Sequence, residues 1–281
     1  MLFRTIYIVL LFFVCITKCF FFDITILPEK PKAGEGIFVK IKDAYFCSYK
    51  AIYDNKIYAL YKTGNGFNEA LIPVDINEKG VKKIIVKRKI LDILLENKEV
   101  DIAIRPRYTK NIYLTENEEK KRKQQPSIIE QQILVLKALD YRSNKKLWNK
   151  GFVLPIKNNI KTQFASNVKG RLTSYSQGGV DIVAPEGTKV RASSDGRVIL
   201  SENNLNVYGT SLIIDHGQGI VSCYFHLKKL LKKTDEMVKR GEIIAESGNT
   251  GWSITPHLYF AVYSHGHYID PLWWINFSNN I

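Results

Sequence analysis

Alternating apolar and polar positions dominate residues 23–115 and predict a domain built from short strands. Apolar side chains recur at every second position in several runs, which is the period of a half-buried strand. Proline and glycine separate these runs, as in the turn at residues 31–36. The predicted strands cover residues 23–28, 37–42, 56–61, 81–86 and 101–105. Strands of this length and spacing predict a small immunoglobulin-like β-sandwich, whose polar residues form a solvated face without a catalytic set.

Residues 116–146 predict a charged linker that leads into a helix. Charged side chains crowd residues 116–125, which indicates a hinge. After Pro126, Ser127 precedes Glu130 by three residues, the spacing of a capping box. The positions that then fit an amphipathic helix are Ile128, Ile129, Ile133, Leu134, Leu136 and Leu139. We expect this helix to pack on one domain; the alternative is a helix that binds a partner.

Residues 147–281 return to a strand pattern. The predicted strands include residues 196–200, 210–215, 220–225 and 257–263, and glycines mark the turns between them. The fold class is therefore mainly β, with an N-terminal β-sandwich, a linker helix and a C-terminal antiparallel β domain. The predicted domain limits are 23–115, 116–146 and 147–281.

Residues 1–22 have the pattern of an export segment. Arg4 precedes an apolar run at residues 6–16, which is shorter than the roughly 20 residues that span a bilayer. This pattern predicts a secretory signal peptide, and a retained membrane anchor is the alternative because no clear cleavage site follows. Lys18 disfavours lipid attachment at Cys19. The chain is thus expected in the periplasm or cell envelope, with the membrane contacted only through this segment.

The net charge of +14 is compatible with several kinds of anionic partner and does not distinguish between them. Nucleic acid, anionic envelope polymer or lipid would each suit a basic protein. No zinc finger, RNA-binding signature or aromatic–basic platform is found, so no nucleic acid partner is expected. Cys47 and Cys223 remain outside the export segment and fall in different predicted domains. An exported chain could pair them, but a buried apolar role is favoured for Cys223 by its strand-like surroundings.

An ordered series of motifs in the last 135 or so residues carries the chemistry. Gln177 and Asp181 open it in a Gln-x-x-x-Asp spacing, His226 follows in Tyr-Phe-His-Leu, and His257 and Tyr259 close it in Pro-His-Leu-Tyr-Phe. The series resembles the lysostaphin/LytM-type zinc endopeptidases, which cut peptide crosslinks in bacterial cell walls. That family writes its first motif as His-x-x-x-Asp and its last as His-x-His.

The resemblance implies a metal site with two of its three ligands replaced. Asp181 occupies a ligand position, whereas Gln177 and Tyr259 stand where the family has histidines. The two histidines that flank the metal in active members, and handle protons or the oxyanion, correspond to His226 and His257. The resemblance therefore assigns His226 and His257 as retained catalytic positions, and all five residues to a binding groove.

The replacement side chains are poor zinc ligands. An amide oxygen is neutral, and a phenol with a pKa of about 10 must lose its proton to bind a metal. Residues 257 and 259 point to the same face of a strand, so Tyr259 is predicted to fill the place of the missing imidazole. No cofactor is expected. Zinc at Asp181, Tyr259, His257 and Gln177 belongs to the alternative in which the site is active.

Three further histidines lie outside this set. His265 and His267 flank Gly266 in a predicted surface turn, which could bind a metal adventitiously. His216, in Asp-His-Gly, matches a family position outside the metal ligands, and we interpret it as structural.

Three functions follow from these patterns. The first is an exported envelope protein whose non-catalytic LytM-like domain binds peptidoglycan or regulates a cell-wall hydrolase. The second is a zinc metalloendopeptidase that cleaves peptidoglycan crosslinks with a variant metal site. The third is a structural or adhesion module that binds a protein partner.

Overall fold

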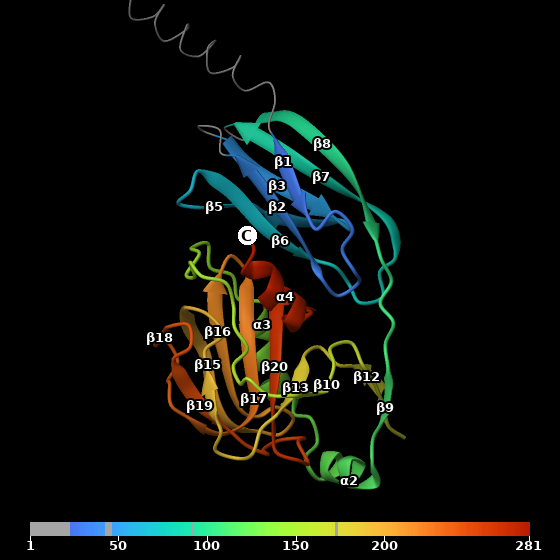
Figure 1. The fold of residues 1–281 in the computed structure, drawn as a ribbon, viewed down its shortest axis with the longest axis vertical. Coiled ribbons are helices and arrows are strands. Elements are labelled where there is room, and N and C mark those ends of the chain that lie inside the picture. The colour runs from blue at the N-terminus through green and yellow to red at the C-terminus, as the bar shows by residue number, and fades with distance from the viewer. Residues whose placement is uncertain (1–22, 43–46, 91–92, 172–173) are drawn as a thin grey trace, which may run out of the picture. The chain divides into compact units, whose positions relative to one another are not determined.

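A computed structural model describes residues 23–42, 47–90, 93–171 and 174–281, and these residues form a mainly β protein, as predicted (Figure 1). Backbone contacts divide the chain into two compact units. Of the described residues, the first unit contains those within 23–29, 37–71 and 81–102; the second contains the remainder, including those from Ala103. The domain limits given above remain a prediction from the sequence.

The first unit is built from two four-stranded sheets. One sheet has the order β1 (Ile24–Leu27), β2 (Gly36–Lys42), β6 (Phe67–Pro73) and β5 (Tyr61–Lys62). The other has the order β4 (Lys56–Ala59), β3 (Cys47–Tyr53), β7 (Gly80–Ile90) and β8 (Ile93–Ile104). Antiparallel register joins β1 to β2, β5 to β6, and β3 to both β4 and β7. The immunoglobulin-like assignment of these strands stays a prediction.

The second unit is organised around a large sheet. Its strands follow the order β10 (Ile160–Thr162), β13 (Val180–Val183), β20 (His257–Ser264), β17 (Ile220–Leu230), β16 (Gly209–Gly217), β15 (Gly196–Leu205) and β18 (Met237–Val238). Three more strands join it at the sides, namely β14 (Lys189–Arg191), β19 (Ile243–Ser247) and β21 (His267–Ile269). A separate small sheet contains β12 (Ser174–Ser176), β11 (Asn167–Lys169) and β9 (Asn111–Tyr113).

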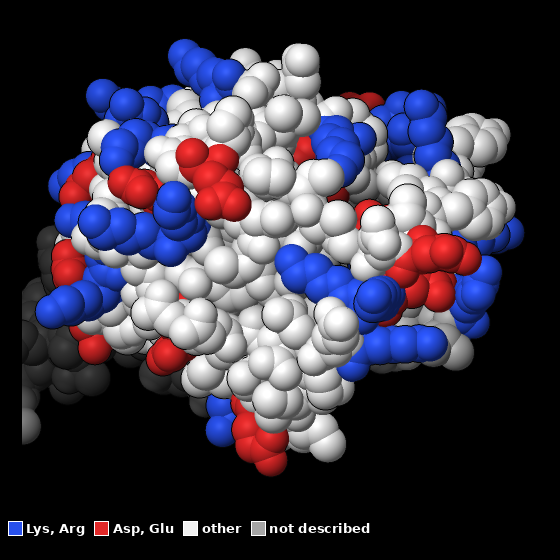
Figure 2. All heavy atoms as spheres, turned by 90° about the horizontal axis from the view of Figure 1, so that it is seen from below, with Lys and Arg blue, Asp and Glu red and all other residues white. Residues whose placement is uncertain are grey.

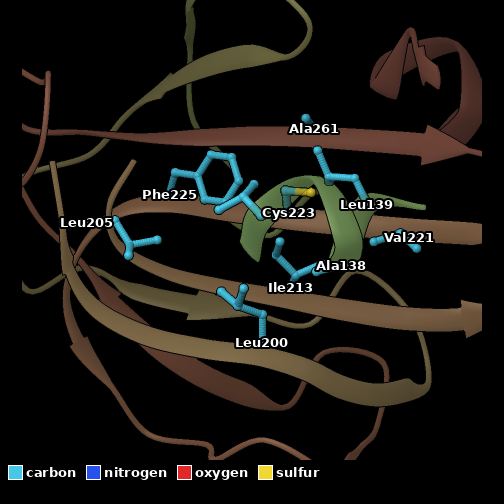
Figure 3. Packing of buried hydrophobic residues seen from close by; sticks show 10 residues of the cluster. Ala138, Leu139, Leu200, Leu205, Ile213, Val221, Cys223, Phe225 and Ala261 are labelled. Atoms are coloured by element: carbon cyan, nitrogen blue, oxygen red, sulfur yellow. The ribbon is translucent and has the colours of Figure 1, made fainter. Parts of the chain in front are cut away.

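Two helices cover apolar parts of this unit. Helix α3 (Ile129–Leu139) buries Val135, Ala138 and Leu139, which share one face because they are three and four positions apart. These side chains pack on strand residues such as Ile213 and Phe225 (Figure 3). Helix α4 (Pro271–Ser278) begins with Asp270 accepting a hydrogen bond from the Leu272 amide, and it buries Trp274.

The charged segment that follows the first strands is a helix, which corrects the predicted hinge. Helix α2 spans Glu116–Gln124, and its capping box is formed by Thr115 and Glu118. The capping box predicted at Ser127 is wrong, because Ile128 is the N-cap of α3 and makes no side-chain cap bond. The Ser127 hydroxyl instead accepts a hydrogen bond from the Gln132 amide.

The export segment at residues 1–22 lies outside the described residues. Among the helices that the structure does describe, none has the length and apolar character needed to cross a membrane. The two cysteines of the described part, Cys47 and Cys223, are both buried and form no disulfide with each other, so the pairing left open by the sequence is not made.

Candidate functional site

Three neighbouring strands bring the five predicted residues together; we call Gln177, Asp181, His226, His257 and Tyr259 the five-residue site. On β13 and β20, Asp181 lies directly opposite Tyr259 in antiparallel register. On the other side of β20, Tyr259 pairs with Phe225 of β17, immediately before His226. Residues far apart in the sequence thus become neighbours because β13, β20 and β17 are adjacent (Figure 1).

Gln177 binds Asp181 through its amide nitrogen. The Gln177 Nε2 atom donates to Asp181 Oδ1 at 2.9 Å, and the Gln177 side chain is buried. His257 Nε2 lies 3.6 Å from the same carboxylate oxygen. Asp181, the one retained ligand position, therefore already accepts an N–H donor from the residue at the first lost ligand position.

Both histidines are oriented by backbone carbonyl groups. His226 Nδ1 lies 2.9 Å from the Thr250 carbonyl oxygen, and His257 Nδ1 lies 2.8 Å from that of Thr255. Because a carbonyl oxygen only accepts, Nδ1 carries the proton in each ring and Nε2 is the acceptor of the neutral form. The two rings lie with their centroids 5.0 Å apart.

An irregularity in β17 aims His226 into the site. After Phe225 the strand stops pairing with β20, and from Leu227 it pairs with β19. The residue between them, His226, has a φ of 63°, a conformation that costs a non-glycine residue on the order of 1 kcal/mol. Burial lowers the pKa of His226 to about 3, assisted by His257 and by the cations of Lys121 and Arg122. His226 is thus a neutral imidazole over the physiological range.

Tyr259 lies against the backbone of the Gly178–Gly179 segment. A Cβ atom on Gly179 would come within 2.9 Å of Tyr259 Cζ, so glycine is needed there for the close approach. The ring stacks on Phe225 with centroids 5.5 Å apart. Burial raises the pKa of the Tyr259 phenol well above its ordinary value, and nearby Tyr263 and Asp181 raise it further. The phenol is a neutral group here.

These donors do not fit a zinc ion. A catalytic zinc site takes three protein ligands, usually imidazole, carboxylate or thiolate. At the three positions where the family has metal ligands, only Asp181 supplies such a group. Gln177 presents its N–H to Asp181, and Tyr259 is a neutral phenol. Across the described residues, no cluster of three or more His, Cys, Asp or Glu side chains could hold a metal. The five-residue site therefore lacks the donor set of a catalytic zinc centre.

Helix α2 brings two cations next to the site, Lys121 and Arg122, which were not predicted from the sequence. Lys121 Nζ donates to the carbonyl oxygens of Asn249 (3.3 Å) and Ser253. The Arg122 guanidinium lies over the rings of Tyr175 and Trp252, with Cζ 5.3 and 4.9 Å from their centroids. The Thr115-x-x-Glu118 spacing could have revealed the helix, but nothing local predicts contacts to residues 175 and 252.

The other histidines lie elsewhere in the unit. His216 is fully buried, with Nδ1 2.7 Å from the Asp195 carbonyl oxygen and Nε2 2.7 Å from the Ser222 hydroxyl, as fits the structural role we gave it. His265 is buried, whereas His267 is exposed, so the predicted surface turn presents only one of its two histidines. Burial lowers the pKa of both His216 and His265 to about 4.

Comparison with known proteins identifies the domain that holds the site. Residues 175–271 match the family model described as Peptidase family M23. An uncharacterized metalloprotease of Haemophilus influenzae is 38% identical over 105 residues, or 37% of this chain and 22% of that protein. A lipoprotein NlpD/LppB homolog of Pseudomonas aeruginosa is 36% identical over 122 residues (43% and 39%). The murein hydrolase activator EnvC of Escherichia coli is 37% identical over 97 residues (34% and 23%).

A solved structure supports the same fold. A crystal structure from Pseudomonas aeruginosa, described as peptidase M23, matches 81% of this chain and 87% of that chain, with a TM-score of 0.60 and 20% identity. The C-terminal part of the chain is therefore a Peptidase M23 domain of the lysostaphin/LytM type, which confirms the resemblance. The matches span only 22% to 39% of the length of the three curated relatives.

Proposed function

We propose that this chain is an exported cell-envelope protein whose M23 domain binds peptidoglycan or a cell-wall hydrolase without cutting. The observation that carries the proposal is the Gln177–Asp181 hydrogen bond, which uses the one retained ligand as an acceptor. A neutral amide, a neutral phenol and two imidazole rings make a site suited to hydrogen bonding with peptide groups. The roles of His226 and His257 as binding rather than proton-transfer residues belong to this proposal.

The relatives support a place in the cell wall and leave two chemistries open. EnvC is named as a murein hydrolase activator, and the Haemophilus influenzae relative as a metalloprotease. The side chains of the five-residue site favour a non-catalytic role, such as that of an activator, over that of a metalloprotease. The NlpD/LppB relative is named as a lipoprotein, which agrees with a location in the envelope.

Charge supports an anionic polymer as one ligand. The chain carries 41 Lys and Arg against 27 Asp and Glu. On the face drawn in Figure 2, the two signs are interspersed between broad uncharged areas, without a single basic stripe of the kind that tracks a nucleic acid backbone. Binding to wall polymer should therefore weaken as salt rises, because exposed charges are screened.

Co-sedimentation with purified sacculi tests the binding function. We expect the wild-type chain to be retained, and we expect Asp181→Lys to lower retention about tenfold, since it places an unpaired cation inside the site. Glu202→Lys is the matched control, because it makes the same charge change at an exposed residue. Tryptophan emission checks folding, as all four tryptophans lie in the second unit.

Two outcomes would redirect this proposal. If neither variant changes retention, the five-residue site is not the binding surface. If the chain is not retained at all and does not stimulate a purified wall amidase, the third function, a module for another protein partner, takes its place.

A further inference from the structure

Charged and polar groups of helix α2 hold it on the rest of the second unit. None of its residues is buried, and its mean hydropathy is that of a solvated segment. Its contacts run through the side chains of Lys121 and Arg122, through the Gln125 carbonyl oxygen, which accepts from Trp252 Nε1 at 2.7 Å, and through Glu119 and Glu116 to Arg171. Without an apolar anchor, such a helix can leave its place at a low cost.

The surface beneath α2 is specific for cations. It offers only acceptors to Lys121, in the carbonyl oxygens of Asn249 and Ser253. It offers two aromatic faces to Arg122, together with the Tyr175 hydroxyl, which accepts from Nη2 at 3.0 Å. A guanidinium over tyrosine and tryptophan rings is attracted by their negative faces. We call Tyr175, Asn249, Trp252 and Ser253 the cation clamp.

The fit of α2 to this surface is incomplete. The Nε and Nη1 atoms of Arg122 are buried and make no hydrogen bond to any residue that the structure describes. A guanidinium carries five N–H donors, and leaving donors buried without acceptors is unfavourable. The clamp thus holds Arg122 against two aromatic rings, while two of its buried nitrogen atoms lack acceptors among the described residues. Because this burial is unfavourable, another segment could replace α2 on the clamp.

The cation clamp is joined to the five-residue site through one loop. Asn249 and Ser253 hold Lys121, while the Thr250 carbonyl oxygen binds His226 and the Ser253 hydroxyl lies 2.9 Å from His257 Nδ1. The charges of Lys121 and Arg122 also reach His226, whose pKa they help to lower. A change of occupant in the clamp would therefore change the surroundings of both His226 and His257.

We propose that the cation clamp is a binding site for an adjacent lysine–arginine pair on a helical segment. Within the chain, Lys121 and Arg122 of α2 fill this site. When α2 leaves, a basic helical segment of a partner protein takes its place. The tether at both ends of α2 gives it a high effective concentration, so a partner binds in proportion to the fraction of chains in which α2 is displaced. The inference that this exchange controls access to the five-residue site rests on the proposed function. The preference of the clamp for a lysine–arginine pair does not depend on that function.

The test uses a labelled peptide with the sequence of residues 115–125 and measures fluorescence anisotropy on the purified chain. We expect the dissociation constant to be at least tenfold lower for the Lys121→Ala/Arg122→Ala chain, whose clamp is vacant, than for the wild type. Adding Trp252→Ala to that chain should raise the constant again by at least tenfold. No wall polymer or hydrolase is present, so failure here is distinct from failure of the proposed function.

Matched peptides separate recognition from general charge attraction. A peptide with Lys120→Ala/Lys123→Ala loses two cations from exposed positions of α2 and should compete as well as the parent. A peptide with Lys121→Ala/Arg122→Ala loses the same charge and should not compete. Equal competition by both, equal binding to vacant and wild-type chains, or no binding to the vacant chain would each overturn the proposal.

Hydrogen exchange gives a second readout that needs no peptide binding. A nine-residue helix is marginal in water, so α2 should lose protection once it leaves the domain. We expect the α2 amides to exchange at least tenfold faster in the Lys121→Ala/Arg122→Ala chain than in the Lys120→Ala/Lys123→Ala chain. Equal protection in the two chains would show that the clamp does not hold α2.

Discussion

Replacing Gln177 and Tyr259 by histidine should give a chain that binds about one zinc ion, whereas the native chain binds far less than one. Residues 181 and 259 are directly paired across two strands, and the residue 177 side chain already reaches Asp181. Two imidazoles at these positions would complete three protein ligands and leave a fourth position open. Zinc per mole after loading and desalting is the measurement.

The control for this prediction is the Gln177→Ala/Tyr259→Phe chain, which changes the same positions without adding a ligand. It should stay metal-free and should keep the ring stacking of residue 259 on Phe225. If the native chain holds nearly one equivalent of zinc, or if the double-histidine chain holds none while its tryptophan emission is native, our account of the donor set is wrong.

Acid should destabilise the second unit well before its carboxylates titrate. Burial keeps His216 and His265 neutral in the fold, with pKa values of about 4 against an ordinary value of about 6.5. Between these values the unfolded chain binds more protons, so stability is full above pH 6.5 and is lost as the pH falls. Burial also lowers the pKa of His226, to about 3, so three such groups act together. The free energy of unfolding should therefore fall on the order of 5 kcal/mol from pH 7 to pH 5.

Urea unfolding followed by tryptophan emission measures this loss in the second unit, where all four tryptophans lie. Asp215 acts in the opposite direction, because burial raises the pKa of its carboxyl, and so its contribution offsets part of the loss at the acid end. The His265→Gln chain should lose about two-thirds as much stability over the same pH range. A stability that is flat or rises toward pH 5 would contradict the neutral state of these histidines.

The strands were predicted where side chains alternate and missed where they do not. Strands β2, β16 and β20 were found from period-two patterns or apolar runs bounded by glycine. Strand β3 was missed although Cys47, Tyr49, Ala51 and Tyr53 alternate in burial, because tyrosine and cysteine give a weak signal beside lysine and serine. Helix α2 was missed because it has no apolar stripe.

The five-residue site was predictable because each member lies in a short motif with fixed spacing. The resemblance to the LytM-type family that these motifs carry grouped Asp181, His226 and His257 without a structure, and in the structure the strands that carry them are adjacent. The cation clamp was not predictable, since Arg122 meets Tyr175 and Trp252 across long separations in the sequence. The hydrogen bond that Gln177 donates to Asp181, at a position where the family has a metal ligand, was likewise not predictable from the sequence.

The most direct test of the central claim, that this M23 domain binds without cutting, is the release of new amino termini from purified sacculi. The native chain, with and without added zinc, should release no more than its Asp181→Ala variant while remaining bound to the wall. A zinc-dependent rise in amino termini that Asp181→Ala abolishes would show an active peptidase and contradict the claim.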